Sequence, residues 1–519
     1  MKTRIFTLVL CVTIDMCTAI ADNLTYEFDN STGELVISGT GPMERIYSGN
    51  TSVKSVIITE GVTSLPKVAF NNCSNLISIS IAESVTSIGE KAFYNCKKLT
   101  EITIPKNVTS IGKEVLAWCN NLNKLTWDVI SYPNNKFDIT KSPFSATFID
   151  TLILGDDVVI VPENLCEDFN LLTSVSFGKN VQTVFPNCFS SCADLSIITV
   201  SVENSKFDCR ENSNALIETA TNTLVLGGKN TTIPNNITSI GDYAFAGRGP
   251  NYETGGYGEG LVTLNIPSSV TSIGSYAFSD CKNLVTLNIP NTITFIGEDA
   301  FANCWKLPSM VIPDGVTSIK GATFSNCYAL SSIELSNNLD TIGANAFENC
   351  GNLTNITFPT TLTSIGSYAF HNCTALAGLT LPDNLSSIEP YTFHSCTSLD
   401  SITIPSQVSK IGWCAFCKCQ GLKSVKFLRN EPAELEKFVF SEVGSPFTIH
   451  VPCNTGNLYR GAWEDLVGDC IEESDCGADF ENIYIEKVEQ HSVNKVIRDG
   501  HIFIERNDKT YTVTGQEIK

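Results

Sequence analysis

A 23-residue repeat constrains this chain more than any other feature of its sequence. From residue 278 onward a phenylalanine recurs every 23 residues, and a cysteine follows each one three residues later. The pairs are Phe278/Cys281, Phe301/Cys304, Phe324/Cys327, Phe347/Cys350, Phe370/Cys373, Phe393/Cys396 and Phe416/Cys419. An earlier block has the same register at Phe70/Cys73, Phe93/Cys96 and Leu116/Cys119. Self-similarity at a fixed period of this size is typical of a solenoid.

One copy, residues 99–119, indicates what each repeat forms. Ile102 and Ile104 alternate with polar residues, which is the period of a β-strand, and Pro105 ends that strand because it cannot donate to a ladder. A second short extended piece ends at Gly112, and the remainder has room for a single helical or 3₁₀ turn. We therefore expect a mainly β, right-handed solenoid of 23-residue coils with short helical or 3₁₀ turns.

A single copy cannot fold alone. Ordering each residue costs roughly 1–2 kcal/mol of backbone entropy, whereas each inward apolar side chain contributes roughly 1.5–3 kcal/mol when buried. Stacked coils, about 4.8 Å apart, bury a continuous core and pair their strands. The repeat therefore requires many neighbouring copies.

The repeat unit also points to a family. The pattern Leu-x-x-Ile-x-Ile-Pro-x-x-Val-Thr-Ser-Ile-Gly-x-x-Ala-Phe-x-x-Cys resembles the BspA-like class of leucine-rich repeats. Residues 34–43 are similar to that family's N-terminal strand motif, and residues 215–224 are similar to its inserted hairpin. The resemblance implies a leucine-rich-repeat solenoid from a bacterial or protist surface protein, and several such proteins are regarded as adhesins.

The repeats divide the chain into segments. Residues 126–230 are irregular, with Cys188 and Cys192 out of register, and residues 246–260 form a Gly-rich loop insertion. The open ends of a solenoid require closing caps. The predicted segments are an N-terminal β cap at 22–65, BspA-like repeats at 66–427 and a C-terminal cap at 428–475.

Both ends of the chain carry features of export. Lys2 and Arg4 precede a short apolar stretch and a small-residue site, which predicts a signal peptide at 1–21 with cleavage after Ala21. No apolar run is long enough to cross a membrane. Residues 476–519 read as a small β domain and resemble the C-terminal sorting domain of type IX (Por) secretion cargo. That resemblance implies secretion machinery as a partner and outer-membrane anchoring after processing; the alternative is a plain β appendage.

Outward strand positions are the candidate binding residues. They form rows of small uncharged side chains that can hydrogen-bond an extended protein or a glycan, although such rows also simply suit an exposed sheet. The inserted loop adds Tyr252 and Tyr257, which suit partner contact, or else the loop is a tolerated insertion. The strand candidates are Thr263, Asn265, Thr286, Asn288, Asn355, Thr357, Thr380, Ser401 and Thr403.

The cysteines and histidines leave several interpretations open. The ladder cysteines are stacked core thiols, disulfides between neighbouring coils, or metal ligands, and we favour thiols because free Cys is readily buried. Cys453 and Cys470 are a candidate disulfide. His371 and His394 stand 23 residues apart, so they stack as a metal or pH-sensing pair or are exposed turn residues.

The function classes narrow accordingly. No nucleophile, acid–base or phosphate-binding motif is present, so we expect neither an enzyme nor a cofactor or metal. A net charge of −21 disfavours nucleic acid. The expected function is recognition of, or adhesion to, an extracellular protein or glycan of a host or neighbouring cell. The alternatives are a self-associating surface component and an accessory glycan-binding protein.

Overall fold

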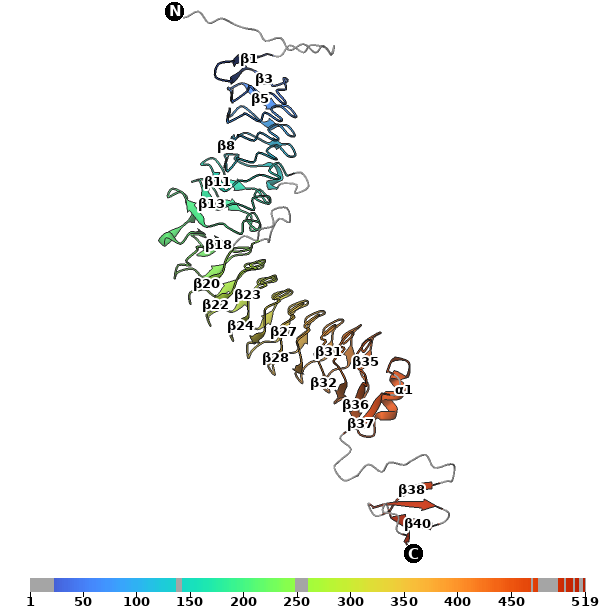
Figure 1. The fold of residues 1–519 in the computed structure, drawn as a ribbon. Helices are drawn as coiled ribbons and strands as arrows, with labels where there is room; N and C mark the ends of the chain where they lie inside the picture. Colours follow the sequence, from blue (N-terminus) through green and yellow to red (C-terminus); the bar gives the residue numbers. More distant parts are fainter. Residues whose placement is uncertain are drawn as a thin grey trace, which may run out of the picture.

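The chain forms a β-solenoid of about 18 turns with a spacing of about 23 residues, as the repeat predicts (Figure 1). The computed structural model describes residues 23–136, 142–247, 260–467 and 470–474, and four strands of the C-terminal tail. The predicted signal peptide, and Tyr252 and Tyr257 of the insertion, lie outside the described residues.

Most coils contribute a first strand that pairs in parallel with the first strand of at least one neighbouring coil. In β8, Ile102 and Ile104 are buried whereas Glu101 and Thr103 are exposed, so the alternation in the sequence matches the burial. The first strands are β4 (Ser55–Ile58), β6 (Ser78–Ile81), β8 (Glu101–Ile104), β10 (Lys124–Trp127), β11 (Thr151–Leu154), β13 (Ser174–Phe177), β15 (Ile197–Val200), β20 (Thr263–Asn265), β22 (Thr286–Asn288), β24 (Ser309–Val311), β26 (Ser332–Glu334), β28 (Asn355–Thr357), β30 (Gly378–Thr380), β32 (Ser401–Ile404), β34 (Ser424–Phe427) and β36 (Thr448–Pro452).

A second row of short strands follows on another side of each coil. The glycine after most of these strands packs against the backbone of the preceding coil: an added Cβ at Gly343 would lie 2.6 Å from the Gly321 nitrogen. The second strands are β3 (Gly41–Pro42), β5 (Val62–Leu65), β7 (Ser87–Ile88), β9 (Ser110–Ile111), β12 (Ile160–Val161), β14 (Thr183–Val184), β19 (Ser239–Ile240), β21 (Ser272–Ile273), β23 (Phe295–Ile296), β25 (Ser318–Ile319), β27 (Thr341–Ile342), β29 (Ser364–Ile365), β31 (Ser387–Ile388), β33 (Lys410–Ile411) and β35 (Glu434–Leu435).

The third segment of a regular coil differs from the single helical or 3₁₀ turn that we expected. Its residues form consecutive turns whose alternate N–H groups donate to the next coil, as from Phe324 to the Ala346 carbonyl at 2.8 Å. Two residues per coil take left-handed backbone, such as Asn345 and Asn349 with φ of 58° and 61°. The described 3₁₀ segments, Pro133–Asn135 and Arg210–Asn212, both lie in the irregular region. The third segment is thus another ladder between coils.

Phenylalanines from successive coils stack through the centre of the solenoid. From Phe245 to Phe416 the ring centroids of neighbours lie 5.2–5.5 Å apart, and their planes differ by at most 13°. This offset stacking is favourable for aromatic rings. The described buried side chains form two clusters, one running from Leu24 to Leu226 and the other from Ala215 to Ile471.

The irregular region contains a hairpin between the two clusters. The hairpin predicted at 215–224 is confirmed: β17 (Ala215–Glu218) pairs antiparallel with β18 (Thr223–Gly227), and β16 (Phe207–Asp208) pairs with β17. The prediction that Cys192 lies out of register is wrong. Its N–H donates to the Phe189 carbonyl at 3.0 Å, as the ladder cysteines do to their phenylalanines. Irregular spacing along the chain conceals this equivalence.

The two ends have their own elements. At the N-terminal end β1 (Leu24–Asp29) pairs antiparallel with β2 (Glu34–Gly39), which then pairs in parallel with β4. After β36, helix α1 (Gly456–Val467) and β37 (Ile471–Ser474) follow. Trp463 of α1 is buried and packs on Phe427, with ring centroids 5.0 Å apart.

The C-terminal tail forms a separate antiparallel sheet. Its strands are β38 (Val493–Arg498), β39 (His501–Arg506), β40 (Lys509–Thr512) and β41 (Glu517–Ile518), paired in this order. Among the residues that the structure describes, no helix has the length and apolar character needed to cross a membrane.

Candidate functional site

The predicted strand residues lie in rows on the surface. All nine are exposed, and each buried neighbour between them points to the core. Thr263 pairs with Thr286 and Asn265 with Asn288 across β20 and β22. Further along, Thr357 pairs with Thr380, and Thr380 pairs with Thr403, across β28, β30 and β32. The structure therefore brings these residues together in two groups, one on β20 and β22 and one on β28 to β32, with β24 and β26 between them. In the second group Asn355 faces a glycine, Gly378, in the next coil.

A cleft of about 490 Å³ opens where one of these rows meets the irregular region. Four predicted residues line it from β20 and β22, and the segment after the hairpin lines the opposite side. Glu211 is the single charged residue among the described lining residues. The lining residues are Glu211, Thr231, Thr232, Ile233, Pro234, Asn235, Thr263, Leu264, Asn265, Pro267, Thr286 and Asn288.

Sequence reasoning missed the opposite side of this cleft. Thr231, Thr232 and Asn235 directly follow the irregular region, and no strand pattern marks them as outward. One signal was available: Thr231-Thr232-Ile233-Pro234 ends in the same Ile-Pro pair that closes the first strand in regular coils. Nothing local in the sequence indicates that this segment stands apart from β20.

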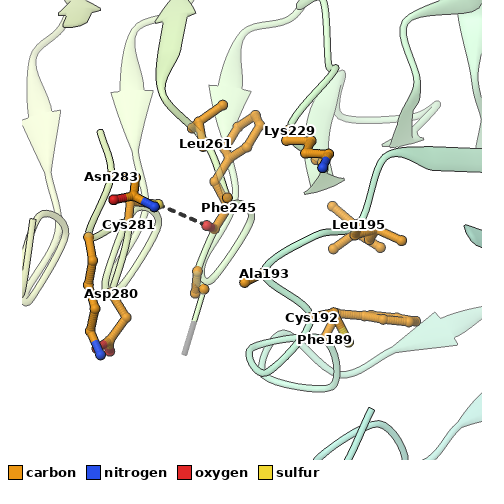
Figure 2. Close-up of a pocket in the computed structure, with 17 residues that line it drawn as sticks. Phe189, Cys192, Ala193, Leu195, Lys229, Phe245, Leu261, Asp280, Cys281 and Asn283 are labelled. Atoms are coloured by element: carbon orange, nitrogen blue, oxygen red, sulfur yellow. Dashed lines mark hydrogen bonds and ion pairs between the residues drawn. The ribbon is translucent and has the colours of Figure 1, made fainter. Parts of the chain in front are cut away.

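A second, much smaller pocket lies beside the loop insertion (Figure 2). It has a volume of about 40 Å³, and Gly247 and Gly260, two described residues of the insertion, are among its lining residues. Phe189 and Leu195 line it from one coil, whereas Phe245 lines it from another. A space of this size holds about three to four waters at most, since each needs roughly 10–15 Å³ of such volume.

The ladder cysteines have a structural role in the described chain. Each thiol donates to the carbonyl of the phenylalanine, or its equivalent, in the preceding coil: Cys327 Sγ lies 3.2 Å from the Phe301 oxygen. The distances for all ten, including Cys73 on Tyr47, are 3.0–3.3 Å. Figure 2 shows one of these bonds, from Cys281 to Phe245.

The structure distinguishes between the interpretations of the ladder cysteines as thiols and as disulfides. The cysteines of the ladder are buried thiols, so disulfides between neighbouring coils are wrong. Within the described residues no group of three or more His, Cys, Asp or Glu side chains is placed to hold a metal ion. Burial raises the pKa of the Cys327, Cys373 and Cys419 thiols to about 12, so these groups are protonated at neutral pH.

We predict that alkylation separates these thiols from the rest. Only the thiolate reacts, and a pKa near 12 leaves a thiolate fraction of about 10⁻⁴ at pH 8. Iodoacetamide at pH 8 should therefore modify half-buried Cys209 in the folded chain long before Cys327, as read by peptide mass spectrometry. The same chain in guanidinium is the control, in which every site should react. Rapid labelling of Cys327 in the folded chain would contradict the assignment.

The other cysteine and histidine predictions have mixed outcomes. The Cys453–Cys470 disulfide is wrong: Cys453 is disulfide-bonded, but its bond is not to Cys470. His371 and His394 do stack, with ring centroids 5.0 Å apart. His371 Nδ1 lies 3.1 Å from a Glu348 carboxylate oxygen. Burial, helped by His371, lowers the pKa of His394, so its neutral form is favoured at physiological pH.

The coil geometry and its buried columns define the class of the protein, a leucine-rich-repeat solenoid. The sequence matches the BspA type leucine rich repeat region over residues 44–129, 128–216, 227–250, 257–376 and 340–467. The chain belongs to this BspA-type family.

Three solved structures are similar to this chain. A leucine-rich repeat protein of Eubacterium ventriosum is 23% identical over 76% of this chain and 93% of its own, with a TM-score of 0.47. A leucine-rich repeat protein of Bacteroides ovatus is 22% identical over 79% and 94%, with a TM-score of 0.40. A leucine rich cell surface protein of Faecalibacterium prausnitzii is 20% identical over 80% and 96%, with a TM-score of 0.34. No curated protein matches the chain.

Proposed function

We propose that this protein is a secreted or cell-surface recognition protein, which binds an extracellular protein or glycan of a host or neighbouring cell without catalysis. The observation that carries the proposal is the exposed hydroxyl and amide side chains of β20 and β22, which line the 490 Å³ cleft. Leucine-rich-repeat solenoids typically use such extended surfaces for binding. The strand residues Thr263 to Thr403 named above, with Tyr252 and Tyr257, are the proposed contacts.

Export is part of the proposal. A leader at 1–21, cleaved after Ala21, would direct the chain out of the cytoplasm. The sheet β38–β41 would serve as a type IX sorting domain, and its removal would leave the solenoid anchored at the outer membrane. Under this scheme residues 22–65 and 428–475 are the caps of the exported solenoid.

The test measures binding of the full chain to arrays of purified extracellular-matrix proteins and of glycans. In the variant Asn265→Lys with Asn288→Lys, a long charged side chain protrudes from each of two adjacent strands. We expect at least a tenfold loss of affinity for any partner that uses the row. The measurement is surface plasmon resonance on the partner that the array identifies.

The matched control is Ser268→Lys with Asn291→Lys. Both residues are exposed and lie three positions after the row in the same two coils, so the added charge is the same. Affinity unchanged by the first variant, or lowered equally by both, would contradict recognition by the row. Absence of any partner on the arrays, with concentration-dependent assembly in sedimentation, would favour the self-associating alternative instead.

A further inference from the structure

Strand β20 has an edge with which no other strand of the described chain pairs. The Thr286 N–H donates to the Val262 carbonyl, and the Ile266 N–H donates to the Asn288 carbonyl, both at 3.3 Å. In a parallel ladder alternate residues face opposite neighbours, so Thr263 and Asn265 direct their backbone groups away from β22. Within the described residues these two backbones have no hydrogen-bond partner on that side.

The coil before β20 does not supply the missing neighbour. Pro234 precedes Pro267 by 33 residues, the interval that also separates the bonded pair Ser239 and Ser272 of these two coils. Residues 230–233 should therefore lie against β20. Instead the Thr232 N–H donates to the Ser213 carbonyl at 3.0 Å, and the Thr231 hydroxyl donates to the Asn214 carbonyl at 2.7 Å. The hairpin region thus holds this segment away.

The opening between them is the 490 Å³ cleft, which has Thr231 to Asn235 on one side and Thr263 to Asn265 on the other. The first-strand ladder is also interrupted between β6 and β8, between β22 and β24 and between β26 and β28. Strands β6 and β8, and β26 and β28, still contact each other across their interruptions. The interruption between β22 and β24 has a local cause, because Pro308 has no N–H to donate. At β20 the donors and acceptors are intact and face a space.

We infer that this cleft binds an extended peptide segment of a partner protein, which adds a strand to the free edge of β20. The inference rests on the proposed recognition function and names its partner class. Strand addition is an established mode of peptide recognition, in which the main chain supplies affinity and alternate side chains supply specificity. Here Thr263 and Asn265 would pair with the main chain of the peptide, and Glu211 favours a basic side chain nearby.

The lining of the cleft favours a peptide over a glycan. The described lining residues include no aromatic ring on which a sugar could stack. They do include the backbone edge, whose alternating donors and acceptors match a peptide and have no counterpart in a saccharide.

The probe is a fluorescein-labelled peptide, Lys-Lys-Leu-Val-Thr-Leu-Asn-Ile-Pro. Its last seven residues copy residues 284–290, the strand that pairs with β20 on its other edge. Its twin carries N-methyl groups on alternate amides, which removes the donors and keeps the side chains. We expect the full chain to bind the peptide in fluorescence anisotropy and to bind the twin at least tenfold more weakly. Hydrogen exchange at Thr263 and Asn265 should slow at least tenfold in the complex.

Two proline variants test the edge independently of the peptide. In Thr263→Pro the lost N–H belongs to the free edge, so the denaturant midpoint should be unchanged whereas peptide binding falls at least tenfold. In Thr286→Pro the lost N–H is the donor to Val262, so the midpoint should fall. The two positions occupy the same place in adjacent coils, which makes them a matched pair.

Three results would overturn the inference: equal binding of the peptide and its twin, no binding of either, or an equal loss of stability in the two proline variants. Failure of the proposed function is a different result. If the arrays identify a protein partner but the peptide does not bind, only strand addition is wrong. If the arrays identify no partner, the recognition function itself is wrong.

Discussion

Replacing Phe324 by alanine is expected to lower the free energy of unfolding by about 3–5 kcal/mol, the usual cost of removing a buried phenylalanine. Phe324 is fully buried and stacks on Phe301 and Phe347 at centroid distances of 5.3 and 5.5 Å. Coils contact only their neighbours, so no distant element can fill the cavity. Urea unfolding followed by far-UV circular dichroism measures the change.

Phe295 provides the control for this experiment. It lies on β23 in an adjacent coil and is 46% exposed, so Phe295→Ala should change the free energy of unfolding by about 0.5 kcal/mol or less. Equal effects of the two substitutions would show that the column contributes no more than any other aromatic residue of the solenoid.

Trp463→Ala is expected to destabilise the C-terminal end to a similar extent, by about 3–5 kcal/mol. The indole is 2% exposed, and its Nε1–H donates to the Ala433 carbonyl at 3.0 Å. Its loss removes one of the two rings of α1 that pack on Phe427 and leaves that carbonyl without its donor. The measurement is hydrogen exchange across residues 424–474, which should accelerate there before it does so at β20.

Leu458 lies on the same helix and is 47% exposed, so Leu458→Ala is the matched control. It should leave the exchange of β34 and β36 unchanged. If Trp463→Ala instead leaves the last strands as protected as in the parent chain, α1 does not close the core, and the assignment of 428–475 as a cap fails with it.

The regular part of the fold was predictable because the same residue type recurs at the same position of each repeat. Phe and Cys repeat every 23 residues, and neighbours in such a register lie one above another, which predicts the aromatic column and the buried thiols. The alternation at Ile102 and Ile104 likewise predicts which side chains of each first strand face the core. These inferences depend on spacing alone.

The remaining features depend on contacts that spacing does not encode. In the third segment, residues such as Tyr276 and Tyr368 have a left-handed backbone, which the presence of a tyrosine does not predict. The backbone N–H groups of this segment also donate to the next coil rather than only within the segment. The sequence places Cys192 out of register because the chain between Cys119 and Phe189 has lost the period. The cleft arises because the Thr232 N–H donates to the Ser213 carbonyl and not to β20. This contact depends on how the hairpin region packs, which residue spacing does not specify.

The asparagine side chains at the second left-handed position show how such a molecule can change in evolution. Asn349 donates to Asn326 at 2.8 Å, and Asn372 in turn donates to Asn349 at 2.9 Å. Within this run, each coil offers the next the same amide that it receives from the one before. A gene duplication or deletion of one whole unit within the run therefore leaves both new neighbours matched, and the solenoid can lengthen or shorten without redesign of the coils that remain.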